Sequence, residues 1–242
     1  MSAVNQLHGG SPLKNLKTSL VLLAVLALAV AAVASGALTR SAQTGHGSMA
    51  GMNMTMSHSS GSASAKAVQL RITLNELLGE HAILAIQATQ RGLVGGKDFP
   101  AVAKQLDANS VAISKAIASV YGAAAGRQFL NGKNLWRDHI KDFVAYTVAT
   151  AKHDTAGQKK AVNTLMTYIQ VQAGFFAKAI GLPKQVLVND LTAHVLQLKG
   201  ALDEYNAKQY AKTFSLAHGA YQHMYMTGAA LAGGIAEQKG LK

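Results

Sequence analysis

The stretch LNELLGEHAILAIQA, residues 74–88, decides the fold. Its interior-favouring residues recur at intervals of three and four, namely Leu74, Leu77, Leu78, His81, Leu84, Ala85 and Ala88. That spacing places them on one face of an α-helix, whereas a strand would show an interval of two. Similar spacing continues almost to the end of the chain. The sequence therefore predicts an all-α domain over residues 68–238.

Glycines, prolines and capping residues divide this domain into six expected helices. Gly95 and Gly96 are expected to end the first helix, and Pro100 falls in the first turn of the second. Thr73 and Thr155 each precede a Glu or Gln by three residues and are candidate capping boxes. The expected helices cover residues 70–94, 98–121, 126–152, 156–181, 184–205 and 207–237. Short turns make such helices antiparallel neighbours in a helical bundle.

Three segments of the domain resemble one another. Each has a large apolar residue three positions before a histidine, and each continues through a turn into a second apolar helix. The histidines are His81, His139 and His194, separated by 58 and 55 residues. We interpret these segments as three stacked helical hairpins that share one core.

Several short patterns in this region also resemble a known family. They are Leu77-Leu78-x-Glu80-His81, Ser119-Val120-Tyr121-Gly122, Leu135-Trp136-x-x-His139 and Ala220-Tyr221-x-His223-Met224. Over residues 70–238 the chain resembles a bacterial family of exported helical-bundle domains, some of which occur with copper-amine-oxidase-like N-terminal modules. The resemblance implies a helical fold and export, and it implies no activity.

The N-terminus predicts the compartment. Residues 1–17 form a short basic segment expected in the cytoplasm, and residues 18–39 contain an uncharged apolar run, Leu20–Leu38. This run is long enough for a transmembrane anchor, while Ala32-Val33-Ala34 offers a signal-peptidase pattern, so anchor and cleaved signal peptide both remain open. With positive charge on the N-terminal side, either alternative places the rest of the chain in the cell envelope, on the extracytoplasmic or periplasmic side.

Residues 40–67 are predicted to be a disordered linker that contains a Met/His strip, Gly45–His58. The strip lacks carboxylates, and its candidate ligands are His46, Met49, Met52, Met54, Met56 and His58. Thioether and imidazole groups suit copper, and methionine favours the cuprous ion. The strip resembles the Met/His-rich segments of bacterial periplasmic copper-resistance proteins. The alternative is a spacer that binds no metal.

Charge and cysteine content exclude several classes of function. The formal net charge is +12, yet the lysines are scattered and no nucleic-acid motif occurs, so an anionic membrane surface is the expected neighbour and nucleic acid is not. The chain has no cysteine, which excludes disulfides, thiolate metal sites and cysteine catalysis. Catalytic motifs are also absent, so we do not expect an enzyme.

Interior histidines are the first candidate site in the domain. His81, His139 and His194 belong to apolar helical faces, and if the three hairpins pack with a common register these imidazoles could approach one another and make an interior metal or haem site. Asp190 lies four residues before His194, a spacing that allows chelation or orientation of the imidazole. The alternative is that each histidine hydrogen bonds to a neighbouring helix and only specifies packing.

The last helix offers a second candidate. His223 and Met226 are three residues apart, and His218 lies nearby, so these three residues are a candidate copper acceptor. The sequence thus favours an exported helical-bundle protein that binds copper through the Met/His strip and hands it to, or withholds it from, other extracytoplasmic copper proteins. Two alternatives remain, a metal-free interaction or sensory bundle and a bis-histidine haem protein.

Overall fold

The computed structural model describes residues 61–241, with side chains from residue 65 onward. That part of the chain is all-α and contains no strand, which confirms the predicted fold class. It has six long helices and one short one. They are α1 (Gly61–Leu93), α2 (Phe99–Tyr121), α3 (Ala123–Asn131), α4 (Trp136–Ala151), α5 (Thr155–Ile180), α6 (Lys184–Asn206) and α7 (Tyr210–Lys239).

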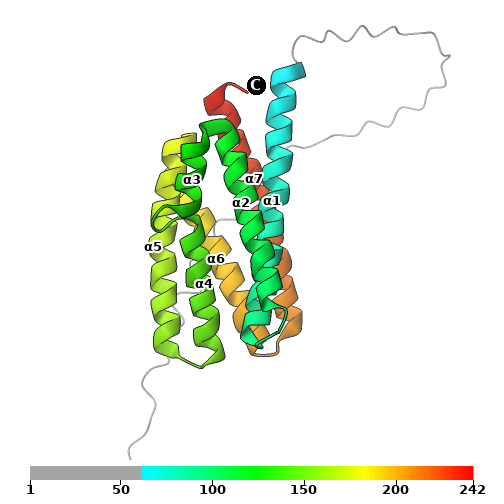
Figure 1. Cartoon of the computed structure of the whole chain (residues 1–242), viewed down its shortest axis with the longest axis vertical. Coiled ribbons are helices and arrows are strands. Elements are labelled where there is room, and N and C mark those ends of the chain that lie inside the picture. Colours follow the sequence, from blue (N-terminus) through cyan, green and yellow to red (C-terminus); the bar gives the residue numbers. More distant parts are fainter. Residues whose placement is uncertain (1–60, 242) are drawn as a thin grey trace, which may run out of the picture. The chain divides into compact units, whose positions relative to one another are not determined.

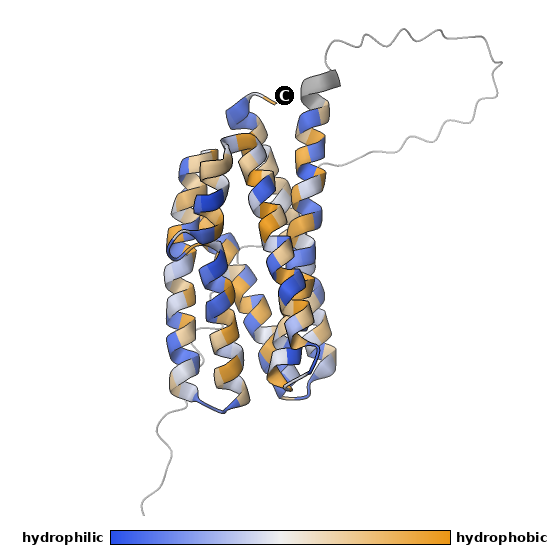
Figure 2. Cartoon of the chain, in the orientation of Figure 1, coloured by the Kyte–Doolittle hydropathy of each residue, from blue (hydrophilic) through white to orange (hydrophobic). Residues whose placement is uncertain are grey.

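Neighbouring helices pack lengthwise into a bundle. Helix α1 packs against α2 and α7, α4 packs against α5, and α6 packs against α7. Figure 1 shows α4 and α5 side by side, with α2 close to α1. In Figure 2 apolar and hydrophilic residues alternate around each helix, as expected when one face of a helix is buried. None of the helices in residues 61–241 is both long and apolar enough to cross a membrane.

Glycine ends two helices as expected from the sequence. Gly95 follows α1 with φ +65°, and Gly181 caps α5 with φ +74°. Both lie in the left-handed region, which glycine adopts without steric cost. Pro100 lies in the first turn of α2, where its missing N–H costs no helical hydrogen bond.

The expected single helix 126–152 is wrong, because the chain forms α3 and α4 there. Gly132 leaves α3 in an extended conformation, and Asn134 has φ +55°. The backbone N–H of Asn134 donates to Asp138 Oδ2 at 2.8 Å, which stabilises the turn before α4. Glycine and asparagine favour such turns, and here their local preference outweighs the helical periodicity on either side.

The beginnings of two other helices also differ from expectation. Helix α1 begins at Gly61, so the residues between 61 and 67, expected as linker, are helical, and Thr73 is interior to a helix and caps nothing. Helix α5 is capped by Asp154, whose Oδ1 accepts from the Gly157 N–H at 2.9 Å, while Thr155 is already helical. A carboxylate is as good an N-cap as a hydroxyl, so the acidic residue one position earlier takes the role.

Two glycines let α7 approach α1 closely. A Cβ atom on Gly228 would lie 2.7 Å from the Leu74 carbonyl oxygen, and one on Gly79 would lie 2.8 Å from the Tyr221 ring. Real Cβ atoms do not tolerate such contacts, so larger residues at these positions would separate the helices. The two helices therefore meet almost backbone to backbone at Gly228.

Candidate functional site

Three histidines from three different helices meet in the interior of the bundle. His81 on α1, His139 on α4 and His194 on α6 are only 1%, 4% and 2% exposed. The His81 ring centroid lies 5.5 Å from that of His139 and 5.9 Å from that of His194. The structure thus brings together the three histidines that the sequence singled out.

His81 and His139 make the closest contact in this cluster. Their Nε2 atoms are 3.4 Å apart. Between two neutral imidazoles, one Nε2 donates and the other accepts. Both Nε2 atoms therefore point at the same small volume between α1 and α4.

Aromatic side chains hold these rings in place. The Trp136 ring lies 4.8 Å from His81 and 4.9 Å from His139, and its Nε1 donates to Ser110 Oγ at 3.1 Å. Tyr168 on α5 stacks on His139 at 4.5 Å with an interplanar angle of 24°. Close packing on two sides restricts the rotation of the His139 ring.

Burial keeps the three imidazoles neutral. It lowers the pKa of His81 well below 6.5, and proximity to His139 lowers it further. The pKa of His139 falls to about 3 because of burial and then His194, although a contact with the Trp136 backbone opposes the shift. Burial, followed by His81 and His223, also lowers the pKa of His194. Each ring therefore keeps a nitrogen lone pair at neutral pH.

The histidine cluster has unused hydrogen-bonding capacity. The Nδ1 atoms of His81, His139 and His194 are buried. Among the described residues, none of the three atoms has a hydrogen-bond partner. The contact between His81 and His139 joins two helices, as the packing alternative expects, and it leaves the Nδ1 atoms without partners. Buried polar atoms without partners are uncommon and often mark a place where an ion, water or ligand binds.

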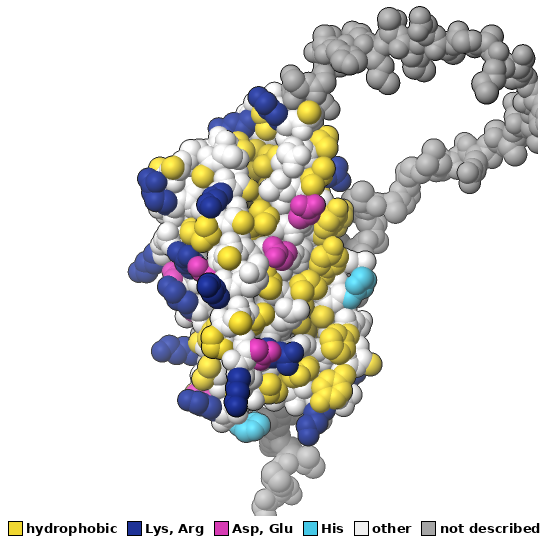
Figure 3. Space-filling model, turned by 45° about the vertical axis from the view of Figure 1, so that its right-hand side comes forward, with side chains coloured by type: hydrophobic (Ala, Val, Ile, Leu, Met, Phe, Trp, Pro, Cys, Tyr) yellow, Lys and Arg dark blue, Asp and Glu magenta, His cyan; other side chains and the backbone are white. Residues whose placement is uncertain are grey.

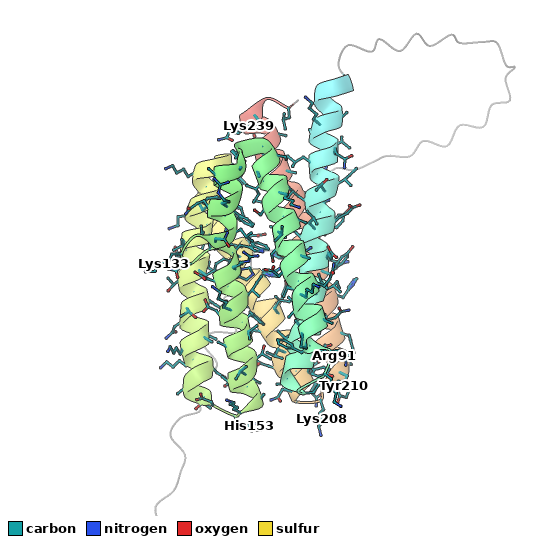
Figure 4. All side chains as sticks on the ribbon, viewed as in Figure 1. Arg91, Lys133, His153, Lys208, Tyr210 and Lys239 are labelled. Atoms are coloured by element: carbon teal, nitrogen blue, oxygen red, sulfur yellow. The ribbon has the colours of Figure 1, made fainter. Side chains whose placement is uncertain are left out.

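A cavity of about 360 Å³ reaches this cluster, and we call it the histidine cavity. Its inner wall includes all three histidine rings, and its sides come from α1, α2, α4 and α6. Its outer end is formed by the turn between α1 and α2, with Arg91 and Lys97 among the lining residues. Figure 4 labels Arg91 at the end of the bundle where this turn lies. The volume falls in the usual range of small-molecule sites, about 300–1,000 Å³.

Asp190 has a different partner from the one expected. It faces His223 on α7 instead of orienting His194, with 3.3 Å between Asp190 Oδ1 and His223 Nε2. Thr227 Oγ1 donates to the same carboxylate at 3.0 Å. Burial raises the Asp190 pKa, while His223 and Thr227 oppose the shift. Helix packing between α6 and α7 sets this pairing, and spacing along α6 does not reveal it.

The residues of the other expected copper acceptor, His218, His223 and Met226, do not share one environment. His223 Nε2 also lies 3.0 Å from the Asp190 backbone oxygen, so this histidine is engaged with α6. Met226 is 62% exposed and His218 is exposed. Throughout residues 61–241, no set of three or more His, Asp or Glu side chains is placed to hold a metal ion.

Part of the site could not be found from the sequence. Some residues that the sequence predicted as ligands lie outside the part of the chain that the structure describes. Tyr168 carries no local signal because it reaches His139 from another helix. Trp136 lies three residues before His139, the same helical spacing that identified the histidines. The Met/His strip, with His46, Met49, Met52, Met54, Met56 and His58, lies outside the described residues, as does the apolar run Leu20–Leu38.

Comparisons of the chain with protein-family models, with curated proteins and with solved structures find no match.

Proposed function

We propose that this protein is an exported, membrane-tethered copper-binding protein whose interior pair, His81 and His139, holds the ion. The observation that carries the proposal is the 3.4 Å separation of the two Nε2 atoms. Two imidazole nitrogens bound to one tetrahedral ion at about 2.0–2.1 Å lie roughly 3.3 Å apart. The separation of the two nitrogens therefore matches that of two ligands on one ion.

The chemistry of the pair also favours a soft or borderline ion. Neutral imidazoles are the form that binds metals, and burial keeps His81 and His139 in that form. The chain has no thiol, so histidine and methionine are its soft ligands. Copper accepts both, and its cuprous form accepts thioethers readily.

Capture is assigned to the Met/His strip. Its thioethers and imidazoles would bind copper weakly and exchange it quickly, and tethering would keep their local concentration high. His218, His223 and Met226 were the acceptor expected from the sequence. Because His223 is engaged with Asp190, the interior pair is the better acceptor.

The interpretation of the bundle as three stacked helical hairpins is part of the same proposal. Three hairpins, formed by α1 with α2, α4 with α5, and α6 with α7, would be related units stacked on one core. The first helix of each unit contributes one interior histidine, namely His81, His139 or His194. Helices α1 and α2, α4 and α5, and α6 and α7 pack against each other as such hairpins require, while the most extensive contacts, between α1 and α7, join two different units.

Compartment and partners complete the proposal. The basic segment followed by Leu20–Leu38 favours export, either as an anchor or as a cleaved signal. Other extracytoplasmic copper proteins would receive the ion by ligand exchange, and the basic surface would face anionic lipid. In the face shown in Figure 3, Lys and Arg side chains are dispersed and do not form one basic patch. We propose binding and transfer, without catalysis.

Haem is less well supported than a bare ion. A bis-histidine haem places the porphyrin iron between two imidazoles on opposite sides of a plane. His81 and His139 instead contact each other directly through Nε2, which leaves no slot for a porphyrin between them. A visible absorption spectrum of the purified protein would test this alternative, and a metal-free sensory bundle would show neither a haem band nor bound copper.

Copper titration of the full-length chain tests the proposal. Cu(I) is added under reducing conditions in competition with a chromophoric chelator, while fluorescence is followed from Trp136, the chain's single tryptophan. Because its ring lies 4.8 Å from His81, copper at the interior pair should quench it. A strip variant with leucine at the four methionines should bind fewer ions and keep the quenching. The substituted positions are Met49, Met52, Met54 and Met56.

Variants of the pair provide the second arm. His81→Gln and His139→Gln should each abolish the quenching, whereas His218→Gln, at an exposed position, should leave it unchanged. Circular dichroism establishes that each variant is folded. Failure of the wild-type chain to retain Cu(I), or wild-type binding without quenching, would reject the interior copper site without recourse to any variant.

A further inference from the structure

The histidine cavity suggests a second binding activity that does not require a metal. Its walls between the cluster and the surface are apolar and come from four helices. Representative lining residues are Ala85, Leu106, Phe143, Val195 and Leu198. All five are buried, between 2% and 8% exposed. An apolar space of this size favours an apolar group over water, since water there would find few hydrogen-bond partners.

The outer end of the cavity is cationic. Arg91 and Lys97 line it, and no carboxylate is among the lining residues. Arg91 Nε forms an exposed ion pair with Asp98 Oδ2 at 3.1 Å, so this carboxylate offsets part of the positive charge while the other guanidinium N–H groups can donate elsewhere. Lys97 is exposed on the same turn. An anion at this end would meet two positive side chains.

The inner end has the opposite preference. His81, His139 and His194 are only 1%, 4% and 2% exposed there, and the Lys and Arg side chains among the lining residues, Lys97 and Arg91, lie at the outer end. A carboxylate carried to the inner end would lose its hydration without gaining a countercharge, which is unfavourable. A ligand with one apolar end and one anionic end would therefore enter with its apolar end first.

We propose that the histidine cavity binds a monocarboxylate with an unbranched alkyl tail. The tail lies between α1, α2, α4 and α6 and ends near the histidine rings. The carboxylate stays at the α1–α2 turn, where Arg91 and Lys97 bind it. The cavity shares His81 and His139 with the proposed copper site, but this binding requires no metal and takes place in metal-free protein.

Octanoate is the test ligand, and octan-1-ol is its uncharged counterpart. Each is titrated by calorimetry into the full-length, chelator-treated chain held in amphipol. The mouth variant combines Arg91→Gln with Lys97→Gln. The matched control combines Lys159→Gln with Lys160→Gln, which removes the same charge from exposed positions on α5. Partitioning of the ligand into amphipol is the same for both double variants and cancels in the comparison.

The mouth variant should bind octanoate about fivefold more weakly than the wild type, as expected for the loss of two partly solvated charge contacts. The control variant should bind as the wild type does, and octanol should bind similarly to all three proteins. Ala88→Leu, which adds side-chain volume to the cavity wall, should weaken both ligands. If Ala88→Leu does not fold, the comparison between the mouth variant and its matched control still tests the proposal.

Two results would overturn the proposal. One is the absence of saturable octanoate binding by the wild-type chain at millimolar concentration. The other is equal octanoate affinity in the wild type and the mouth variant, which would show that the mouth does not recognise the anion. Neither result bears on copper, because the titrations use metal-free protein, so failure here and failure of the copper site are distinguishable.

Discussion

His81 on α1 and His139 on α4 face each other through their Nε2 atoms at 3.4 Å, although 58 residues separate them in the chain. Both are almost fully buried, and both pack against Trp136. A polar contact of this kind joins two helices that are far apart in the sequence. It has consequences for stability as well as for binding.

Acid should destabilise the metal-free bundle. The pKa values of His81, His139 and His194 are lowered on folding, so the unfolded chain binds protons that the folded chain excludes. Their contribution is complete above an unfolded pKa near 6.5 and declines as the pH falls, down to about 3 for His139. Between its unfolded and its folded pKa, each histidine lowers the free energy of unfolding by about 1.4 kcal/mol for each pH unit of acidification.

Urea unfolding between about pH 7.5 and pH 5 measures this effect. His139→Phe removes one of the three buried imidazoles, so it should show a shallower slope than the wild type. The raised pKa of Asp190 acts in the opposite direction, because the folded chain then keeps a proton that the unfolded carboxyl loses. A wild-type stability that does not change over this range would contradict the expectation.

Gly228→Ala should destabilise the protein by about 2–4 kcal/mol, in the range of substitutions that force a packed core apart. Its Cβ would lie 2.7 Å from the Leu74 carbonyl oxygen, and a backbone atom cannot relieve this contact by a change of rotamer as a side chain can. Gly233→Ala, on the same helix with no heavy atom within 4 Å of the new Cβ, is the matched control. That change should be neutral or stabilising by up to about 1 kcal/mol. Urea midpoints of the two variants give the comparison, and similar midpoints would refute it.

Phe129→Ala should be among the most costly truncations in the bundle, at about 3–5 kcal/mol. Phe129 on the short helix α3 is 0% exposed and packs against Trp136, with 4.9 Å between ring centroids. Phe214→Ala removes the same atoms from a side chain that is 61% exposed, so its effect should stay within about 0.5 kcal/mol. Thermal unfolding followed by circular dichroism measures both. Equal losses would mean that α3 does not anchor the core.

Asp154→Ala should cost about 1 kcal/mol, because its side chain caps α5 through the Gly157 N–H. Thr155→Ala tests the cap expected from the sequence and should change stability little, since Thr155 is exposed and already helical. Denaturant titration distinguishes the two. A larger loss for Thr155→Ala would restore the original capping box.

The sequence predicted most of the helices because their signals are local. Apolar periodicity, Gly95, Gly181 and Pro100 act within one or two turns, and the structure uses them as expected. Where two local signals compete, the prediction failed, as at the turn after Gly132 that separates α3 from α4.

The site was predicted in part for a related reason. Burial of the three histidines follows from their place on apolar helical faces, and their convergence was one of two interpretations that the sequence left open. Partners across helices depend on how two helices are rotated against each other, which spacing along one helix does not encode. For that reason the pairing of Asp190 with His223, the stacking of Tyr168 on His139 and the histidine cavity were not found.

The close seam at Gly228 also affects how the protein is made. Helix α1 is the first helix of the bundle to leave the ribosome, and α7, which supplies its most extensive contacts, is the last. Until α7 has been synthesised, the apolar face of α1 that it covers has no permanent partner, and closing the seam joins residues more than 150 positions apart. A nascent chain stalled before α7 would therefore expose this face and be prone to aggregate.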